Sequence, residues 1–224
     1  MDHSHIDITN HLHQAALGAH IDEEALNNIC DLSKYFNFSG LCTNLIRLPT
    51  ARKRLGATTT KLIAVIAFPF GDIPINLKIQ EAEWAANKGA EELDMVPNFF
   101  ALSQGKINIF AEELAQICEL DLPVRVILDV ENLSKEKLSL AVEASIDAGA
   151  FGIQAGNGFG PPVQPKTIKE LVNLTKGRCA IKAVGGIRTL PHAIELIEAG
   201  SIQLGTSAGG ELMKELKRFK SNGV

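Results

Sequence analysis

The sequence predicts an α/β protein that folds as a single (β/α)8 (TIM) barrel. Short apolar runs rich in β-branched residues alternate with longer stretches of helical periodicity, and eight such units fit within the 224 residues. Each unit then has about 28 residues, close to the length of a βα repeat. No Pro- or Ser-rich linker, charged block or low-complexity tract interrupts the series. We therefore expect one domain over residues 1–224.

The expected strands are short, and the apolar runs Leu62–Ala67 and Val124–Leu128 are typical of strands covered on both faces. A doubly wound open sheet is the alternative fold, but the G-x-G-x-x-G that its dinucleotide site needs after the first strand is absent there. The predicted strands are Ile6–Thr9, Phe38–Thr43, Leu62–Ala67, Glu92–Val96, Val124–Val130, Ala150–Gln154, Cys179–Ala183 and Ser201–Gly205.

Amphipathic stretches between the strands predict helices. Ile75–Lys88 repeats apolar residues at helical spacing, and Ser134–Ala148 begins with a serine that is suited to the N-cap position. Three helical patterns end in a glycine just before a strand, where a left-handed C-terminal residue is common. These glycines are Gly89, Gly149 and Gly200.

Composition and charge exclude several classes of function. The net charge is −4, from 22 basic and 26 acidic residues, and no basic run suggests binding to nucleic acid. The longest apolar run, Leu62–Phe70, contains a proline and is too short to span a membrane. The first residues do not resemble a signal peptide, and the four cysteines form no C-x-x-C pair. We therefore expect a cytoplasmic protein that binds neither nucleic acid nor membrane.

Two charged residues are candidates for chemistry, because the active site of such a barrel forms at the carboxyl ends of its strands. Lys182 lies in an apolar strand, and a buried amine can serve as a nucleophile or a proton carrier. Asp94 has an inward position near the end of its strand, so Lys182 is its expected partner. The sequence leaves open whether they form an acid/base pair or a structural ion pair. Asp129 and Glu131 are a candidate second acidic pair, to which we assign no chemistry.

Glycine-rich segments follow the last two expected strands. Gly185-Gly186 and Gly205-Thr206-Ser207 occupy the two loops in which barrels of this kind often bind phosphate through backbone N–H groups. Ordinary turns that need glycine are the alternative. Because both loops have this composition, we expect a phosphate site.

Metal and serine chemistry are not expected. His11-x-His13 resembles the first ligands of metal-dependent barrel hydrolases, but only His192 lies outside the first twenty residues, which is too few for such a centre. No G-x-S-x-G is present for a nucleophilic serine. We expect neither a metal nor another cofactor.

Several motifs resemble those of the deoxyribose-phosphate aldolase family, and they occur in the family's order from Asp7 to Gly210. The resemblance implies a (β/α)8 class I aldolase that cleaves 2-deoxyribose 5-phosphate to glyceraldehyde 3-phosphate and acetaldehyde without a metal. It also implies that Asp94 and Lys182 match the proton-relay pair, and that Asp7 and Cys42 match positions near the substrate. Gly185, Gly186, Gly205, Thr206 and Ser207 match the phosphate-binding loops. The motifs are Gly40–Asn44, Ala67–Gly71, Glu92–Val96, Phe159–Pro161, Lys182–Thr189 and Leu204–Gly209.

One position departs from the family pattern. The family's strand six ends in Lys-Thr-Ser-Thr-Gly, whose lysine forms the Schiff base, whereas this chain has Gln154-Ala155-Gly156. An amide nitrogen is neither basic nor nucleophilic, so Gln154 cannot form an imine. The opening motif also differs, with Asp7–His11 in place of Asp-His-Thr-Leu-Leu. Since Asp94 favours the ammonium form of Lys182, we expect aldolase turnover to be much reduced or absent.

Three functions remain open from the sequence. The first is an aldolase-type carbon–carbon lyase, and the second is a non-catalytic sugar-phosphate-binding or regulatory barrel. The third is a proton-transfer isomerase that uses Asp94 and Lys182, with Gln154 holding a carbonyl oxygen. In each case the expected ligand is a small phosphorylated sugar or aldehyde. We also expect a homodimer or a higher homo-oligomer.

Overall fold

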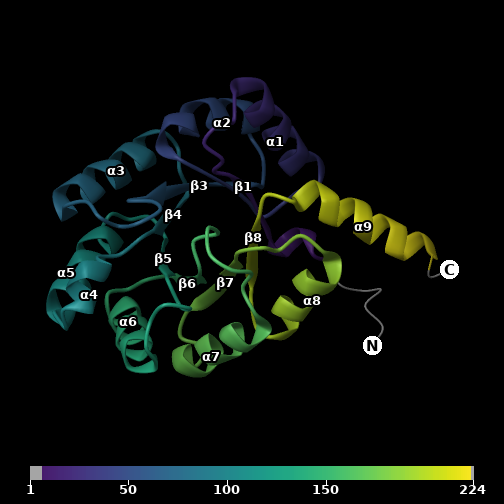
Figure 1. Ribbon diagram of the computed structural model, residues 1–224. Helices are drawn as coiled ribbons and strands as arrows, with labels where there is room; N and C mark the ends of the chain where they lie inside the picture. Colours follow the sequence, from purple (N-terminus) through teal and green to yellow (C-terminus); the bar gives the residue numbers. More distant parts are fainter. Residues whose placement is uncertain (1–6, 223–224) are drawn as a thin grey trace.

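The computed structural model describes residues 7–222, which form a closed barrel of eight parallel strands surrounded by helices (Figure 1). The strands follow one another around the barrel in chain order, and β1 closes it by pairing with β8. The predicted (β/α)8 barrel is therefore confirmed. The strands are β1 (Leu12–Ala16), β2 (Gly40–Thr43), β3 (Lys61–Ile66), β4 (Glu92–Met95), β5 (Val124–Leu128), β6 (Gly152–Ala155), β7 (Ala180–Val184) and β8 (Gln203–Thr206).

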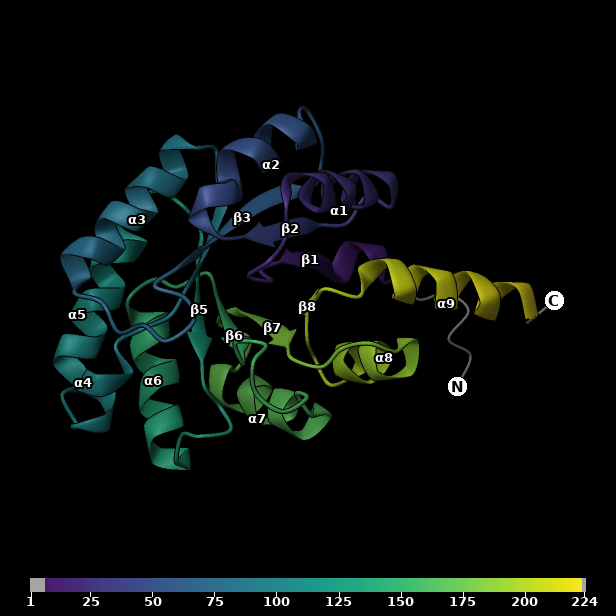
Figure 2. The same ribbon diagram turned by 45° about the horizontal axis from the view of Figure 1, so that its top comes forward.

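The helices form the outer layer in both views of the barrel (Figure 2). The predicted helices at Ile75–Lys88 and Ser134–Ala148 are confirmed, and the Ser134 hydroxyl accepts a hydrogen bond from Lys137 N at 3.3 Å. The helices are α1 (Glu23–Tyr35), α2 (Leu48–Leu55), α3 (Ile75–Asn87), α4 (Phe99–Ser103), α5 (Ile107–Cys118), α6 (Lys135–Asp147), α7 (Pro165–Thr175), α8 (Leu190–Glu198) and α9 (Gly209–Asn222), with short 3-10 turns η1 (Thr9–His11) and η2 (Leu45–Arg47).

The core has two parts, because alternate residues of a strand face opposite sides of the sheet. Leu62, Ala64 and Ile66 of β3 belong to the large apolar cluster that the strands form with the helices. Ile63 and Val65 of the same strand instead pack with Cys42 of β2 inside the barrel. The continuous apolar run in the sequence thus reflects a strand that is buried on both faces.

The first strand was predicted in the wrong place. Residues 7–11 lie before β1, where Thr9–His11 form a 3-10 turn, and Ile6 lies outside the described residues. Asp7 stabilises the turn, because its carboxylate accepts hydrogen bonds from Thr9 N at 3.0 Å and from the Asn10 side chain at 3.2 Å. These local bonds satisfy the backbone without a strand partner. The strand begins six residues later than predicted, where the chain pairs with β2 and β8.

A buried ion pair joins two of the outer helices. Lys78 of α3 donates to Glu113 of α5 at 2.7 Å and to the Val96 carbonyl at 3.1 Å, and both side chains are almost fully buried. Burial raises the pKa of Glu113, and the hydrogen bond from Lys78 opposes that shift. Each charge therefore depends on its partner, since neither has access to water.

We predict that Lys78→Met destabilises the fold by about 3–5 kcal/mol, because it leaves the Glu113 carboxylate buried without a cation. Urea denaturation measures this loss. The matched control is Lys53→Met on the exposed side of α2, which should change the free energy of unfolding by less than about 0.5 kcal/mol. Equal effects of the two substitutions would contradict the assigned importance of the buried pair.

Candidate functional site

A cleft of about 450 Å³ opens at the carboxyl ends of the strands. Its walls come from the segments that follow β1, β3, β6, β7 and β8, so the cleft lies where barrels of this kind place their sites. The structure brings all five predicted loop residues together in its lining: Gly185, Gly186, Gly205, Thr206 and Ser207.

The loops that follow β6 and β7 are held against each other. Val163 N donates to the Gly185 carbonyl at 3.1 Å. Gly186 has a φ of +65°, and a Cβ atom there would lie 2.7 Å from the Cβ of Pro162. A side chain at position 186 would therefore collide with the neighbouring loop as well as strain the backbone. This close contact keeps one wall of the cleft as bare backbone.

The loop after β8 is ordered by two polar side chains. The Thr206 hydroxyl donates to the Ile187 carbonyl at 2.6 Å and accepts from Ala208 N at 2.9 Å. Gln14 of β1 donates to the Ser207 carbonyl at 3.0 Å and accepts from Gly209 N, in the first turn of α9, at 3.2 Å. Gln14 is not among the site residues expected from the sequence, because the first strand is expected six residues too early.

Positive charge at the cleft comes from Arg188 and from the beginning of α9. Arg188 lines the cleft, is exposed, and forms no ion pair with any of residues 7–222. The amino end of a helix adds a partial positive charge. Together with the glycine backbone of the β7 and β8 loops, these groups favour an anion such as phosphate.

Lys182 and Asp94 lie beneath the cleft and do not line it. The Lys182 ammonium donates to one oxygen of Asp94, and the Arg125 guanidinium donates to the other. The side chains of Lys182 and Asp94 are 2% and 1% exposed. Burial alone would raise the pKa of Asp94, but Lys182 and Arg125 outweigh it and hold that pKa well below its usual range. Asp94 is therefore a carboxylate fixed between two cations.

The series of ion pairs continues from Arg125 toward the other end of the barrel. Arg125 also donates to Glu92 at 3.0 Å, and Lys61 donates to the second Glu92 oxygen at 2.7 Å. Arg125 and Glu92 are not among the site residues expected from the sequence. The sequence does contain a pattern that could have indicated them. Glu92 and Asp94 are two residues apart and so face the same side of β4, and Arg125 is the register partner of Asp94.

His13 of β1 is also buried within the barrel. Burial lowers its pKa well below the usual value, and the nearby Lys182 and Arg125 cations lower it further. The imidazole is therefore neutral at physiological pH, and its Nδ1 atom has no hydrogen-bond partner among the described residues. His13 thus adds no charge to the network.

Gln154 of β6 is the register partner of Lys182 and is 4% exposed. Its Nε2 atom donates to the Gly156 carbonyl at 2.8 Å, while its Oε1 atom is buried and has no hydrogen-bond partner among residues 7–222. Because a carbonyl can only accept, this bond fixes the orientation of the amide. Position 154 thus presents a carbonyl oxygen next to Lys182 and offers no amine.

Cys42 and Asp7 have different places in the structure. The Cys42 thiol lies 3.7 Å from Asp94, and burial raises its pKa to about 12. It is therefore a neutral thiol within the barrel. Asp7 precedes β1 and accepts hydrogen bonds from Thr9 of η1, so it lies at the amino end of the strand, away from the cleft. The resemblance implies a place for Asp7 near the substrate; the structure instead places Asp7 before the first strand, which begins at Leu12.

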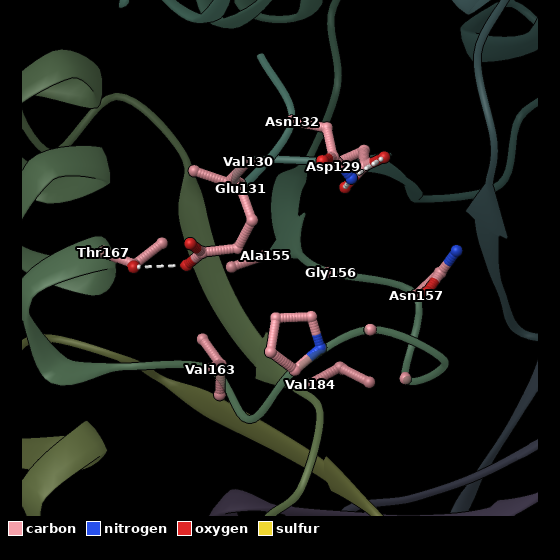
Figure 3. A pocket seen from close by; sticks show the side chains of 13 residues that line it. Asp129, Val130, Glu131, Asn132, Ala155, Gly156, Asn157, Val163, Thr167 and Val184 are labelled. Atoms are coloured by element: carbon pink, nitrogen blue, oxygen red, sulfur yellow. Dashed lines mark hydrogen bonds between the residues drawn. The ribbon is translucent and has the colours of Figure 1, made fainter. Parts of the chain in front are cut away.

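Asp129 and Glu131 line a separate small cavity (Figure 3) and do not act as a pair. Asp129 accepts two hydrogen bonds from the Asn132 amide, at 3.1 and 3.0 Å. Glu131 points toward α7, where it accepts from the Thr167 hydroxyl at 3.0 Å. Each carboxylate thus has its own structural partner.

The described residues show no group of three or more His, Cys, Asp or Glu side chains that is placed to hold a metal ion. Within residues 7–222, no helix is long and apolar enough to cross a membrane.

The fold and the site define a class: a (β/α)8 barrel with a Lys–Asp pair beneath a glycine-walled cleft. The chain is 33% identical to a deoxyribose-phosphate aldolase from Picosynechococcus over 97% of its length and 96% of the relative. It is 36% identical to one from Aquifex aeolicus, over 95% and 98% of the two chains. It therefore belongs to the deoxyribose-phosphate aldolase family. A scan against protein-family models finds no match.

Solved structures agree with this assignment. The structure described as "QR15, an Aldolase" has a TM-score of 0.91 and 34% identity, and the match covers 96% of this chain and 98% of that one. A tetrameric deoxyribose phosphate aldolase from Aeropyrum pernix has a TM-score of 0.85 and 29% identity, covering 96% and 92%.

We predict that Asp94→Asn lowers the free energy of unfolding at pH 7 by about 3–5 kcal/mol, because two buried cations lose their shared carboxylate. The folded-state pKa of Asp94 lies below its unfolded value of about 3.9, so the carboxylate stabilises the fold above about pH 4. That contribution is lost as the pH falls toward the folded-state pKa. Urea denaturation at pH 7 and at pH 3 should therefore show a smaller difference between wild type and variant at pH 3.

The control for this prediction is Asp31→Asn, which removes a carboxylate from a solvent-exposed pair with Arg54. This substitution should lower the free energy of unfolding at pH 7 by less than about 1 kcal/mol. The free energy of unfolding of Asp94→Asn should therefore be compared with that of wild type at both pH values. If the difference is the same at pH 7 and at pH 3, the depressed pKa of Asp94 is contradicted.

Proposed function

We propose that this chain binds a small phosphorylated sugar or aldehyde in the cleft, and that the Schiff-base aldolase reaction of its family is much reduced or absent. The observation that carries the proposal is Gln154, which stands beside Lys182 where the family has its nucleophilic lysine. A barrel that has glycine-rich loops for the phosphate group and lacks the strand-six amine is suited to binding a phosphorylated ligand without forming an imine with it.

Lys182 is a poor substitute for the missing nucleophile. An amine attacks a carbonyl only when it is unprotonated, and Lys182 donates to the fully ionised Asp94. The ammonium is also sealed beneath the cleft, at 2% exposure. A substrate carbonyl in the cleft would therefore not reach a free amine without rearrangement of the ion pair.

A proton-transfer isomerase has less support. Such a reaction would need Asp94 or Lys182 to exchange a proton with the substrate. Both oxygens of Asp94 are engaged by cations, which makes the carboxylate a weak base. The Oε1 atom of Gln154 has no hydrogen-bond partner in the described part of the chain, but an acceptor cannot hold a carbonyl oxygen.

Support for phosphate recognition comes from the walls of the cleft. Gly185, Gly186 and Gly205 leave backbone exposed to a ligand, and Ser207 adds a hydroxyl. Arg188 supplies a cation beside them that forms no ion pair with the described residues. This combination is suited to a phosphate group, whose charge needs several donors and a cation nearby.

We extend the proposal to assembly and compartment. The Aeropyrum pernix relative is described as tetrameric, which supports a homo-oligomer for this chain. The four cysteines are free thiols, which supports a reducing compartment such as the cytoplasm.

We predict that Gln154→Lys gains 2-deoxyribose 5-phosphate cleavage, by at least about 100-fold over wild type, because it returns an amine beside the ion pair. Acetaldehyde release in a coupled assay measures the gain. Borohydride reduction followed by peptide mapping should then find the adduct at position 154. The control is Gln154→Met, which has similar length without an amine and should gain nothing.

The wild-type protein treated in the same way should form no substantial adduct. A stoichiometric borohydride-trapped adduct on Lys182, together with rapid turnover, would show that the family reaction survives. That result would contradict the proposal.

We predict that phosphorylated ligands stabilise the protein and that Arg188→Ala weakens their binding about 5- to 30-fold, as expected for loss of one charge-assisted contact. Thermal shift and calorimetric titration with inorganic phosphate and 2-deoxyribose 5-phosphate measure the effect. Arg218→Ala, on the exposed side of α9, is the control and should bind as wild type does. Equal binding by Arg188→Ala and wild type would place the anion elsewhere.

A further inference from the structure

Val184 shares the inward face of β7 with Lys182. The two are two residues apart, and successive side chains of a strand point to opposite sides of the sheet. Ala183 between them belongs to the apolar cluster that the strands form with the helices, whereas Lys182 bonds to Asp94 inside the barrel. Val184 therefore stands one layer nearer to the carboxyl ends of the strands than Lys182 does.

The linings of the two cavities at this end of the barrel agree with that order. Val184 lines the cleft and also the small cavity of Figure 3, and it is partly exposed. Lys182 lines neither of them, and its side chain is 2% exposed. The Lys182 ammonium is thus separated from the cleft by the groups that lie above it on its own strand and on the neighbouring strands.

On both neighbouring strands the positions beside Val184 are glycines. Gly205 of β8 is its register partner, and Gly156 directly follows the end of β6. A Cβ atom at Gly205 would lie 2.6 Å from the Cγ2 methyl of Val184 and 3.1 Å from Cε of Lys182. A Cβ atom at Gly156 would lie 2.8 Å from the Val184 carbonyl oxygen. Val184 and the stem of Lys182 thus share the space that a side chain at position 205 would take.

The two methyl groups of Val184 extend from β8 toward the loop after β6. The Cγ2 methyl lies over Gly205, while a Cβ atom at Gly158 in that loop would lie 3.5 Å from Cγ1. Because the neighbouring glycines contribute no side chains, the Val184 methyls cover the barrel interior on this side. On the side of β2 and β3, the small apolar cluster around Cys42 covers it.

From this arrangement we propose that Val184 sets the depth of the cleft. It keeps a bound ligand above the ion pair of Lys182 and Asp94, so that no carbonyl group of the ligand reaches the amine. The inference rests on the proposed function, because it takes the cleft as the site of the phosphorylated ligand and adds the residue that holds this ligand away from Lys182. Val184 acts through its size, since a smaller side chain would leave a space that joins the amine to the cleft.

Reaction of the full chain with acetaldehyde tests this role. An unprotonated amine condenses with the aldehyde to an imine and releases water, and cyanoborohydride reduces the imine to an ethylated amine. We expect Val184→Ala to raise the rate of ethylation at Lys182 at least about 10-fold, because the reaction in wild type must wait for local opening of the structure. Peptide mapping after reaction at about pH 9, where lysine amines are partly unprotonated, measures this rate relative to the exposed Lys53.

Three further variants separate the size of the side chain from the stability of the fold. Val184→Ser opens the same space as Val184→Ala and should have the same effect. Val184→Thr keeps the shape of valine and should leave Lys182 as slow to react as in wild type. Val130→Ala removes the same methyl groups from a buried valine two residues beyond the end of β5, which does not line the cleft. A general loss of stability would raise the rate in this variant as well.

The outcomes distinguish this inference from the proposed function, because ethylation by acetaldehyde needs no phosphate site. If Val184→Ala and Val184→Ser react at Lys182 no faster than wild type or than Val130→Ala, the role of Val184 is overturned and the proposed phosphate binding stands. If both react faster but neither inorganic phosphate nor 2-deoxyribose 5-phosphate binds in the titrations above, the proposed function fails. The part of this inference that concerns a ligand then fails with it.

Discussion

The carboxylate of Asp94, held between Lys182 and Arg125, is the constraint on which the site depends. Neither cation has access to water, so each needs this carboxylate or a neighbouring one. Glu92 and Lys61 extend the alternation of charges toward the other end of the barrel. The interior is therefore an ordered polar network enclosed by the apolar layer between strands and helices, and its geometry sets what lies beneath the cleft.

The same network explains why one substitution matters. In the family pattern a second amine stands on strand six, and its charge would compete with Lys182 for the carboxylate. With Gln154 in that place, one oxygen of Asp94 accepts from Lys182 without competition from a second amine, and the other accepts from Arg125. The chain keeps the fold of deoxyribose-phosphate aldolases and has glycine-rich loops at its cleft, while Gln154 on strand six carries no nucleophilic amine.

The cleft above the network is lined by backbone as well as by side chains. The wall at Gly186 is bare backbone, because this glycine lies too close to Pro162 for any side chain. Leu17, Phe68 and Phe159 add apolar side chains from three loops, and Val184 adds one from the end of β7. The hydrogen bonds of Gln14 and Thr206 hold the loop after β8 in place, so part of the polar lining serves to order the site.

The sequence by itself determined the fold class and the loops that meet at the cleft. It also placed both ends of seven of the eight strands to within two residues. Regular alternation of apolar strands with amphipathic helices carries that information locally. The first strand is the exception: Ile8 and Thr9 have the β-branched side chains of a strand, whereas Leu12–Ala16 has little β propensity. Only pairing with β2 and β8 selects the second segment.

Tertiary structure also decided which residues share the barrel interior. Gln14 and Arg125 come from strands far apart in the chain, and neither belongs to a motif that marks it as functional. The sequence named Lys182, Asp94 and Gln154, but only the closed barrel places the first two beneath the cleft rather than in its wall. The physical reason is that strand register, which is set by pairing around the whole barrel, fixes the depth of every inward side chain.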